Sequence, residues 1–285
     1  MSAALANAVK ENEPEVWLKL FPFPKADSHK YSRGTALIRG GSVMTGASRL
    51  AARAAQRAGA GLVTLAAPVS VLPIYAGALE SVISRPCETM REWQALINDA
   101  RHPALLIGPG LGPGPSETEE ILIALEAKRP TVVDADGLTN FANKQKLLFA
   151  KLHAECVLTP HEGEFARLFD GIEGDKISRA LAAAERAGCV VLLKGSETVI
   201  ASPKGDIIVN RNAPPWLATA GAGDVLAGMI LGLVAQKMNA FEAAAAAAWM
   251  HGRVAALHGP GLIAEDIIAG IPVVLNEIFD ISTDK

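Results

Sequence analysis

The sequence predicts a single α/β domain built on a mostly parallel sheet. Strand-like apolar runs alternate with helical segments along most of the chain, which is the order of elements that parallel sheets require. Nearly every expected strand ends in a glycine-rich loop or in a loop with acidic residues and histidine. Because ligands of open α/β sheets bind outside the carboxyl ends of the strands, these loops predict one shared cleft. No linker or change in composition divides the chain, so we expect one domain over residues 1–285.

The expected helices and strands follow this alternating order along the chain. A short helix over 14–20 precedes the first strand, and a helix over 47–58 then leads to the second strand. The expected strands are 35–38, 62–66, 104–107, 131–133, 156–158 and 190–193, followed by a hairpin of 198–201 and 206–210. Three helices at 222–235, 240–257 and 263–278 close the chain.

The composition narrows the classes of function. With 50% hydrophobic and 20% charged residues, a chain of 285 residues can bury a sizeable core. Its 27 basic and 30 acidic residues give a formal charge of −3 without any basic run, so neither nucleic acid nor a membrane is an expected partner. The longest apolar runs, 225–235 and 243–250, are too short to span a bilayer. Three cysteines without a pairing pattern, and a start without a signal-peptide pattern, predict reduced thiols and a cytoplasmic location.

The stretch 217–232 carries the strongest functional signal. Gly221, Ala222 and Gly223 lead into Asp224, and an apolar run follows. We expect a glycine-rich turn at the start of a buried helix, where free backbone N–H groups and the helix dipole favour an anion. A carboxylate beside a bound phosphate then has a natural role, which is to accept the proton of an attacking hydroxyl. The alternative is an ordinary helix start with an acidic first turn, because a short Gly-x-Gly-Asp motif is weak by itself.

Three further strand ends carry polar residues. Asp134 and Asp136 could bind Mg²⁺, orient a phosphate or cap the next helix. His161 and Glu164 follow a proline and lie three apart, near one face of a first helical turn, or they form a capping box with a solvated histidine. Lys194 could place a cation on a nucleotide phosphate, although a surface lysine after a strand is common.

The glycine-rich stretch 108–112 either lines the site or forms a tight surface turn. The helix after it is expected over 116–127, with Ser116 as N-cap and Glu119 completing a capping box. Other catalytic classes lack their motifs: the chain has no Gly-x-Ser-x-Gly elbow, no Walker-type loop and no zinc-ligand spacing.

Taken together, these motifs resemble the ADP- or ATP-dependent NAD(P)H-hydrate dehydratases of the ribokinase-like superfamily. The resemblance runs in one order from about Asp27 to the C-terminus. The motifs that carry it are His29-Lys30, Gly40-Gly-Ser42 with Thr45-Gly-Ala47, Ala58-Gly-Ala-Gly-Leu-Val63, Gly108-Pro-Gly-Leu-Gly112, Asp134-Ala-Asp-Gly-Leu138, Thr159-Pro-His-Glu-Gly-Glu164, Lys194-Gly-Ser196 and Ala218 to Gly228. Tyr31 stands where the family usually has glycine. The family is often fused to an N-terminal epimerase domain, which we do not expect here because only an extension of residues 1–26 precedes the resemblance.

The resemblance implies a three-layer ribokinase-like sandwich and a repair reaction. The S-form of hydrated NADH or NADPH (NADHX, NADPHX) would be phosphorylated on its C6 hydroxyl and would lose phosphate, restoring the reduced cofactor. Asp224 would be the catalytic base while Gly221–Gly223 hold the transferring phosphoryl group of ADP or ATP. Mg²⁺ would lie between phosphates and carboxylates, held by Glu164 through water, with Asp134 as a further candidate.

The remaining roles are also carried over from the family. The resemblance implies that Ala47, Gly110, Gly112, His161 and Asp224 line the hydrate site. It implies a nucleotide site made of Lys194, Gly195, Ser196, Glu197, Thr198, Gly221, Ala222 and Gly223. It also implies a homo-oligomer, with a tetramer favoured.

Two other functions are weighed against this one. A ribokinase-like kinase for a vitamin precursor or a sugar would use the same Asp224 chemistry and stop at the phosphate ester. A nucleotide-sensing domain without catalysis would not need Asp224. The sequence does not distinguish ADP from ATP as donor, or NADHX from NADPHX as substrate.

Overall fold

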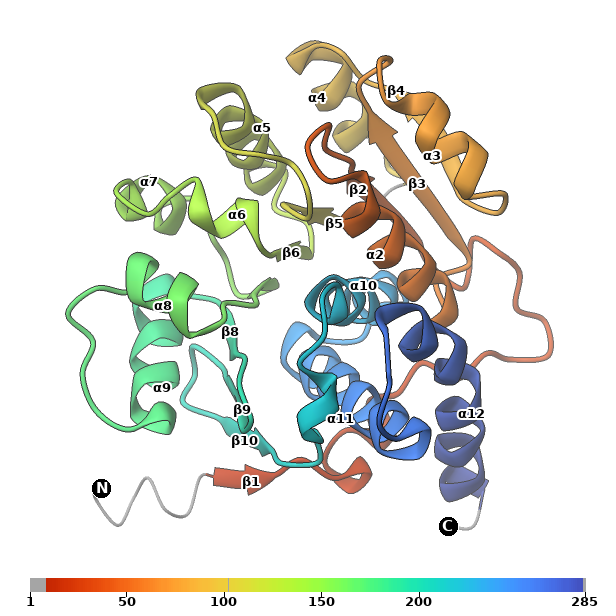
Figure 1. Ribbon diagram of the computed structural model, residues 1–285, viewed down its shortest axis with the longest axis vertical. Coiled ribbons are helices and arrows are strands. Elements are labelled where there is room, and N and C mark those ends of the chain that lie inside the picture. The colour runs from red at the N-terminus through yellow and green to blue at the C-terminus, as the bar shows by residue number, and fades with distance from the viewer. Residues whose placement is uncertain (1–8, 102, 284–285) are drawn as a thin grey trace.

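The computed structural model describes residues 9–101 and 103–283, and its centre is a large sheet (Figure 1). Within the described residues the sheet has 10 strands in the order β1-β10-β9-β8-β7-β6-β5-β2-β3-β4. The strands are β1 (Val9–Glu11), β2 (Thr35–Arg39), β3 (Leu62–Ala67), β4 (Ile83–Pro86), β5 (Ala104–Ile107), β6 (Thr131–Val133), β7 (Cys156–Leu158), β8 (Val190–Leu193), β9 (Thr198–Ala201) and β10 (Ile207–Asn210).

The sheet is mostly parallel, as the sequence predicts. Only β9 runs against its neighbours, pairing antiparallel with both β8 and β10. The predicted hairpin is present, and the hydroxyl of Ser202 accepts hydrogen bonds from the backbone N–H groups of Lys204 and Asp206 in its turn. Because β2 and β5 to β8 are parallel, the loops after them meet at one edge of the sheet.

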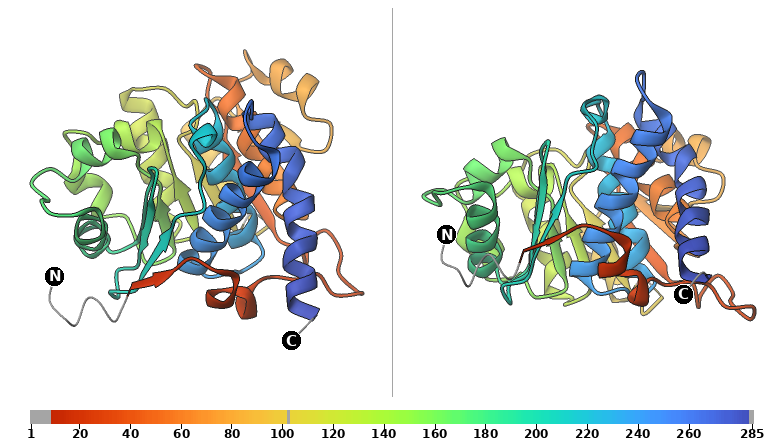
Figure 2. Two further views of the ribbon diagram at one scale, coloured as in Figure 1. Left: turned by 60° about the horizontal axis from the view of Figure 1, so that its bottom comes forward. Right: turned by 90° about the horizontal axis from the view of Figure 1, so that it is seen from below.

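Helices cover both faces of the sheet, which gives the three layers expected (Figures 1 and 2). One layer contains α2 (Thr45–Arg57), α3 (Leu72–Ala78), α10 (Ala222–Ala235), α11 (Ala240–His258) and α12 (Ala264–Thr283). The other contains α4 (Met90–Asn98), α5 (Pro115–Glu126), α6 (Asp136–Thr139), α7 (Gln145–Phe149), α8 (Glu162–Leu168) and α9 (Lys176–Ala187). Successive strand residues point to opposite faces, so that Ile38 packs in the first layer's core and Leu37 in the second's.

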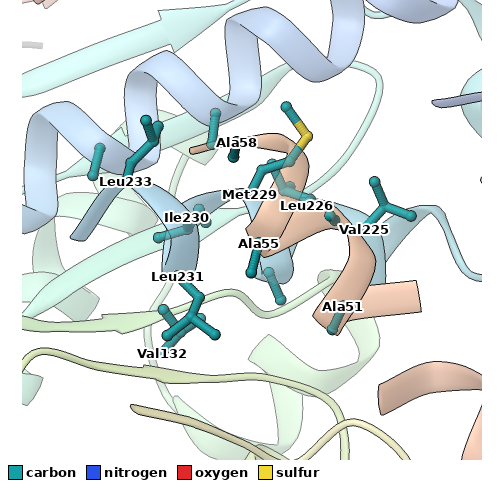
Figure 3. Packing of buried hydrophobic residues seen from close by; sticks show 14 of the residues in the cluster. Ala51, Ala55, Ala58, Val132, Val225, Leu226, Met229, Ile230, Leu231 and Leu233 are labelled. Atoms are coloured by element: carbon teal, nitrogen blue, oxygen red, sulfur yellow. The ribbon is translucent and has the colours of Figure 1, made fainter. Parts of the chain in front are cut away.

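Small residues bring α10 close to α2 in the middle of the first layer (Figure 3). A Cβ atom on Gly228 would lie 2.2 Å from the carbonyl oxygen of Ala51, and one on Gly232 would lie 2.5 Å from that of Ala55. Any larger side chain at these positions would push the helices apart. The apolar run after Asp224 is therefore a helix buried against its neighbours, and its amino end is held at the edge of the sheet where the loops meet.

The N-terminal extension is part of the sheet and the core. β1 pairs parallel with β10, and the buried Asn12 side chain donates to Asn210 Oδ1 (2.8 Å) and to the carbonyl of Ala245 (2.8 Å). Trp17 is fully buried between two 3₁₀ helices, η1 (Pro14–Val16) and η2 (Leu18–Leu20), where one short helix was expected. The first eight residues lie outside the described part of the chain.

Some local predictions are wrong. α5 begins at Pro115 with Gly114 as N-cap, and no capping box forms at Ser116. Proline is favoured at the first helical position, and here it places the N-cap at Gly114, two residues before the serine. The edge strand β4 was not predicted, because its residues are mostly exposed and it ends in proline. None of the described helices is both long and apolar enough to cross a membrane.

Candidate active site

The amino end of α10 presents free backbone amides. Gly221 is the N-cap with φ of +83°, a conformation that favours glycine. The N–H of Ala222 donates weakly to the carbonyl of Thr219 (3.3 Å), whereas those of Gly223 and Asp224 have no acceptor within residues 9–101 and 103–283. The structure thus has the anion-binding geometry that the glycine motif predicts.

The Asp224 carboxyl is held partly protonated at neutral pH. Burial raises its pKa to about 7, and the negative charges of Asp134, Asp136 and Glu164 add to the shift. The ammonium of Lys194 opposes them. A carboxylate whose pKa lies near the working pH suits a general base, because it can both accept and release a proton.

Lys194 lies among these carboxylates. Its Nζ is 2.9 Å from Asp134 Oδ1 and 3.9 Å from Glu164 Oε2, and both acidic side chains are almost fully buried. Burial lowers the pKa of Lys194, but the carboxylates of Asp134 and Glu164 outweigh burial and raise it above its usual value. A Cβ atom on Gly223 would lie 3.4 Å from the same Nζ, so this cation also adjoins the free amides of α10.

His161 and Glu164 form a reciprocal capping box at the start of α8. The Nδ1 atom of His161 accepts from the N–H groups of Gly163 (2.9 Å) and Glu164 (3.3 Å), and Glu164 Oε2 accepts from the N–H of His161 (2.8 Å). This is the structural alternative noted for the pair, and the imidazole is 56% exposed. Burial raises the pKa of Glu164. The cap fixes Glu164 near Lys194, and the imidazole of His161 lies beside Glu164, with 3.5 Å from Nε2 to Oε1.

The loop 194–198 joins β8 to β9 and is held by residues far away in the sequence. The ammonium of Lys176 donates to the carbonyl of Lys194 (3.0 Å) and would contact any side chain at Gly195. Glu197 accepts from the guanidinium of Arg211 (2.8 Å), which also pairs with Glu11 of β1. The N-terminal strand thereby supports one side of this loop.

Two glycine loops interlock on the other side of the site. A Cβ atom on Gly41 would lie 1.8 Å from the carbonyl oxygen of Gly110, and one on Gly110 would lie 2.1 Å from that of Met44. The first turn of α2 follows at once and contains the buried Ala47. The hydroxyl of Ser48 in the same turn donates to the carbonyl of Pro109 (2.6 Å). The loops after β2 and β5 therefore form one unit.

The loop after β5 is also clamped from α6. Asp136 Oδ2 accepts from the N–H of Gly112 (2.8 Å), and Asn140 contacts both Gly112 and Gly114. This loop contact was not among the roles weighed for Asp136, and the N-cap of α6 is Ala135, without a side-chain cap from either aspartate. Asp134 is the one of the pair that meets Lys194.

Sequence reasoning missed three of the residues around the site. Lys176 is the first residue of α9 and Asn140 directly follows α6; neither belongs to a motif, and only the fold brings them to the loops. His251 is buried in the alanine-rich helix α11, and its Nε2 is 2.9 Å from the carbonyl oxygen of Ala222. A histidine within an otherwise apolar run was the one available signal.

The sheet order, the three layers and the glycine-capped α10 with its acidic first turn define a ribokinase-like fold. A ribokinase-like superfamily protein from Enterococcus faecalis matches this fold with a TM-score of 0.83 at 22% identity, covering 95% of this chain and 96% of that one. More narrowly, the chain belongs to the NAD(P)H-hydrate dehydratase family, whose model matches residues 35–268. The family resemblance read from the motifs is confirmed.

Individual relatives agree with this assignment. The bifunctional NAD(P)H-hydrate repair enzyme of Salinibacter ruber is 38% identical over 297 residues, covering 98% of this chain and 55% of that protein. That of Mycobacterium leprae is 39% identical over 253 residues, covering 85% and 50%. The chain thus spans about half the length of the curated relatives it matches. The ADP/ATP-dependent NAD(P)H-hydrate dehydratase of Bacillus subtilis, co-crystallised with ATP and Mg²⁺, is 28% identical with a TM-score of 0.80, covering 95% of this chain and 99% of that one.

Proposed function

We propose that this protein uses ADP or ATP to dehydrate the S-form of hydrated NADH or NADPH, as a metabolite-repair enzyme. The observation that carries the proposal is the placement of Asp224, with a pKa of about 7, beside the free amides of Gly223 and Asp224. Membership of the dehydratase family supports this activity over a kinase that stops at the ester.

Asp224 acts as the general base in this reaction. Its carboxylate takes the proton of the C6 hydroxyl, whose oxygen attacks the terminal phosphorus of the nucleotide. A C6–O–P ester forms as the bond from phosphorus to the nucleotide breaks, leaving AMP or ADP. The ring-nitrogen lone pair then expels phosphate, and loss of the C5 proton restores the C5–C6 double bond. The amides at the start of α10 stabilise the negative charge on the transferring group.

The nucleotide lies along the loop Lys194, Gly195, Ser196, Glu197 and Thr198 and over Gly221, Ala222 and Gly223. Lys194 supports this placement because its ammonium adjoins Gly223 at the start of α10. Its charge offsets the three carboxylates around it, which would otherwise repel a phosphate. The co-crystallised relative from B. subtilis, titled as a complex with ATP and Mg²⁺, also supports a nucleotide site in this fold.

Mg²⁺ fits the carboxylates of this site. No cluster of three or more ligating side chains is preformed in the described part of the chain. Mg²⁺ does not need one, since it keeps several waters and binds through one or two carboxylates plus substrate phosphates. Glu164, through water, and Asp134 are the oxygen donors beside Lys194. The ion would neutralise phosphate charge during transfer.

The hydrate occupies the side of the site formed by the interlocked loops. Ala47, Gly110, Gly112, His161 and Asp224 line it. Membership of the dehydratase family supports this placement. The glycines themselves allow the loops to pack together, since a Cβ atom on Gly110 would meet the carbonyl oxygen of Met44 and one on Gly112 the side chain of Val43.

We further propose a cytoplasmic homo-oligomer, a tetramer by family resemblance. Exposed apolar side chains on α11 and α12, among them Leu257, Val273 and Phe279, support an interface there. A groove of about 330 Å³ lies between these helices. The three buried free cysteines suit a reducing compartment.

One assay tests the proposed reaction. The purified protein is mixed with chemically prepared NADHX, Mg²⁺ and either ADP or ATP, and the absorbance of the reduced nicotinamide is followed. We expect NADH to form in a 1:1 ratio with the nucleotide consumed, as the balanced reaction requires. Restoration at full rate without nucleotide would exclude the phosphoryl mechanism, and nucleotide consumption with accumulation of a phosphate ester would favour a kinase.

A further inference from the structure

A buried histidine lies directly behind the anion-binding turn. His251 of α11 is 6% exposed, and its Nε2 is 2.9 Å from the carbonyl oxygen of Ala222. A carbonyl oxygen can only accept, so Nε2 carries the hydrogen and donates it. Burial lowers the pKa of His251 to about 4, so the ring is neutral near pH 7 and has one N–H to give.

The hydrogen bond from His251 orients the Gly223 N–H as well as the carbonyl of Ala222. The C=O of Ala222 and the N–H of Gly223 belong to one planar trans peptide and point in opposite directions. Holding the oxygen from the core side therefore holds the Gly223 N–H toward the anion site. A hydrogen bond on the carbonyl also polarises the same peptide, which strengthens its N–H as a donor.

Helix α11 fixes the chain leading to this turn on both sides of the imidazole. Asn212 Nδ2 donates to the carbonyl of Trp249 (2.8 Å), and Trp216 Nε1 donates to that of Ala255 (2.7 Å). A Cβ atom on Gly252 would lie 1.9 Å from Asn212 Oδ1, so the helix and this segment are in close contact. The carbonyl of Ala222 thus has little freedom to move relative to the ring.

We propose that His251 is a positioning residue of the anion site, which orients the Ala222–Gly223 peptide so that the Gly223 N–H faces the transferring phosphoryl group. The inference rests on the proposed function for the identity of that group. It assigns the histidine a role that a packing residue would not have, because the role requires a donor at the position of Nε2.

The test compares two replacements that differ in this donor. His251→Leu keeps an apolar side chain of similar bulk and removes the donor, whereas His251→Gln places an amide N–H near the position of Nε2. His258→Leu is the matched control on the same helix, where the histidine is partly exposed beside Asp266 and away from the anion site. The measurements are kcat and KM for NADHX, and Kd for MgATP and for inorganic phosphate in the absence of hydrate.

We expect His251→Leu to lower kcat and to weaken the binding of MgATP and of phosphate by about 10-fold, the upper range for the loss of one hydrogen bond. KM for NADHX should change little, His251→Gln should stay within a few-fold of the wild type, and His258→Leu should be unaffected. Near-normal anion affinity and kcat in His251→Leu would overturn the proposal. So would equal losses in both His251 variants, because a donor would then not be what matters.

Two further readouts keep the outcome decisive. If the wild type fails to restore NADHX, the proposed reaction fails, while the phosphate affinities of the variants still decide the role of His251. If His251→Leu does not fold, ¹⁵N NMR of histidine in the wild type decides it. A protonated Nε2 whose resonance shifts when MgATP binds is expected, and a protonated Nδ1 tautomer would contradict the proposal.

Discussion

The ammonium of Lys194 lies 2.9 Å from the carboxylate of Asp134, and this nearly buried ion pair borders Asp224. The pair places a positive charge where four acidic side chains converge. Without it, burial and mutual repulsion would keep Asp224 protonated to higher pH. The protonation state of Asp224, the proposed general base, therefore depends on a neighbouring lysine that was assigned from the sequence only to the nucleotide.

The first prediction concerns Asp224→Asn. We expect kcat to fall at least about a hundredfold, since a positioned base contributes roughly 10²- to 10⁴-fold. Nucleotide affinity should hold or improve, because a negative charge leaves the vicinity of the phosphates. Steady-state kinetics and calorimetric titration measure the two effects. Asp266→Asn, in the first turn of α12, is the matched control, and turnover within tenfold of the wild type in Asp224→Asn would refute the base assignment.

Stability is the second readout of the same variant. The pKa of Asp224 is raised to about 7, so the folded protein binds more protons than the unfolded chain between about pH 4 and 7. The free energy of unfolding of the wild type should therefore fall relative to that of Asp224→Asn as pH rises through this window, by up to about 1.4 kcal/mol per pH unit. Denaturant unfolding at pH 5 and pH 8 tests this. Equal differences at the two pH values would contradict the raised pKa.

The third prediction is a pH profile. Because the base must be ionised, kcat/KM for the hydrate should decline on the acid side with a midpoint near pH 7. Lys194→Met removes the cation that lowers the pKa of Asp224, so its acid limb should move to higher pH. Lys176→Met, in α9 beside the proposed nucleotide loop, should move the limb less. An unchanged midpoint in Lys194→Met would show that another group controls the profile.

The fourth prediction separates binding from stability at Lys194. Lys194→Ala should raise KM for ADP or ATP more than KM for the hydrate, and it leaves Asp134 buried without its partner. Breaking a buried pair in this way typically costs about 3–5 kcal/mol. Lys194→Met combined with Asp134→Asn should regain much of the stability but not the nucleotide affinity. A change confined to KM for the hydrate would reassign the loop.

The fifth prediction tests the interlocked glycine loops. Gly41→Ala places a methyl group 1.8 Å from the carbonyl oxygen of Gly110, so the loops must separate. KM for the hydrate should rise about tenfold or more while Kd for MgATP stays near the wild-type value, since a small misplacement near the reacting groups can cost 10²-fold. Gly77→Ala is the control, because the added Cβ atom would meet no atom within 4 Å outside its own helix backbone. An equal loss of nucleotide affinity would place these loops at the nucleotide.

Much of the fold could be predicted from the sequence because the buried parallel strands are short apolar runs followed by turn signals. The strands at 104–107, 131–133, 156–158 and 190–193 match the structure residue for residue. The edges of the sheet were harder to predict. β1 and β4 bury little surface of their own, so their pairing depends on neighbours that the local pattern does not show.

The sequence likewise predicted part of the candidate site and missed the rest. Motifs singled out Asp224 and Lys194, although the sequence also left a structural use open for each, and the structure brings the two together at the start of α10. The residues that support the site belong to no sequence motif. Lys176 and His251 each hydrogen-bond to one backbone carbonyl, and Asn140 bonds to both Gly112 and Gly114. Only the tertiary structure brings these partners to the three side chains, so the local sequence gives no sign of them.

The pairing of β1 with β10 has a consequence for shortened forms of the chain. A polypeptide starting near Asp27, where the family motifs begin, would lack the strand that shields β10. The backbone N–H and C=O groups of Ile207–Asn210 that now pair with β1 would then be unpaired, which makes β10 an exposed edge strand. Strands of other molecules can pair with such an edge, and aggregation follows. Strand β1 (Val9–Glu11) thus protects β10 from pairing with the strand of another molecule.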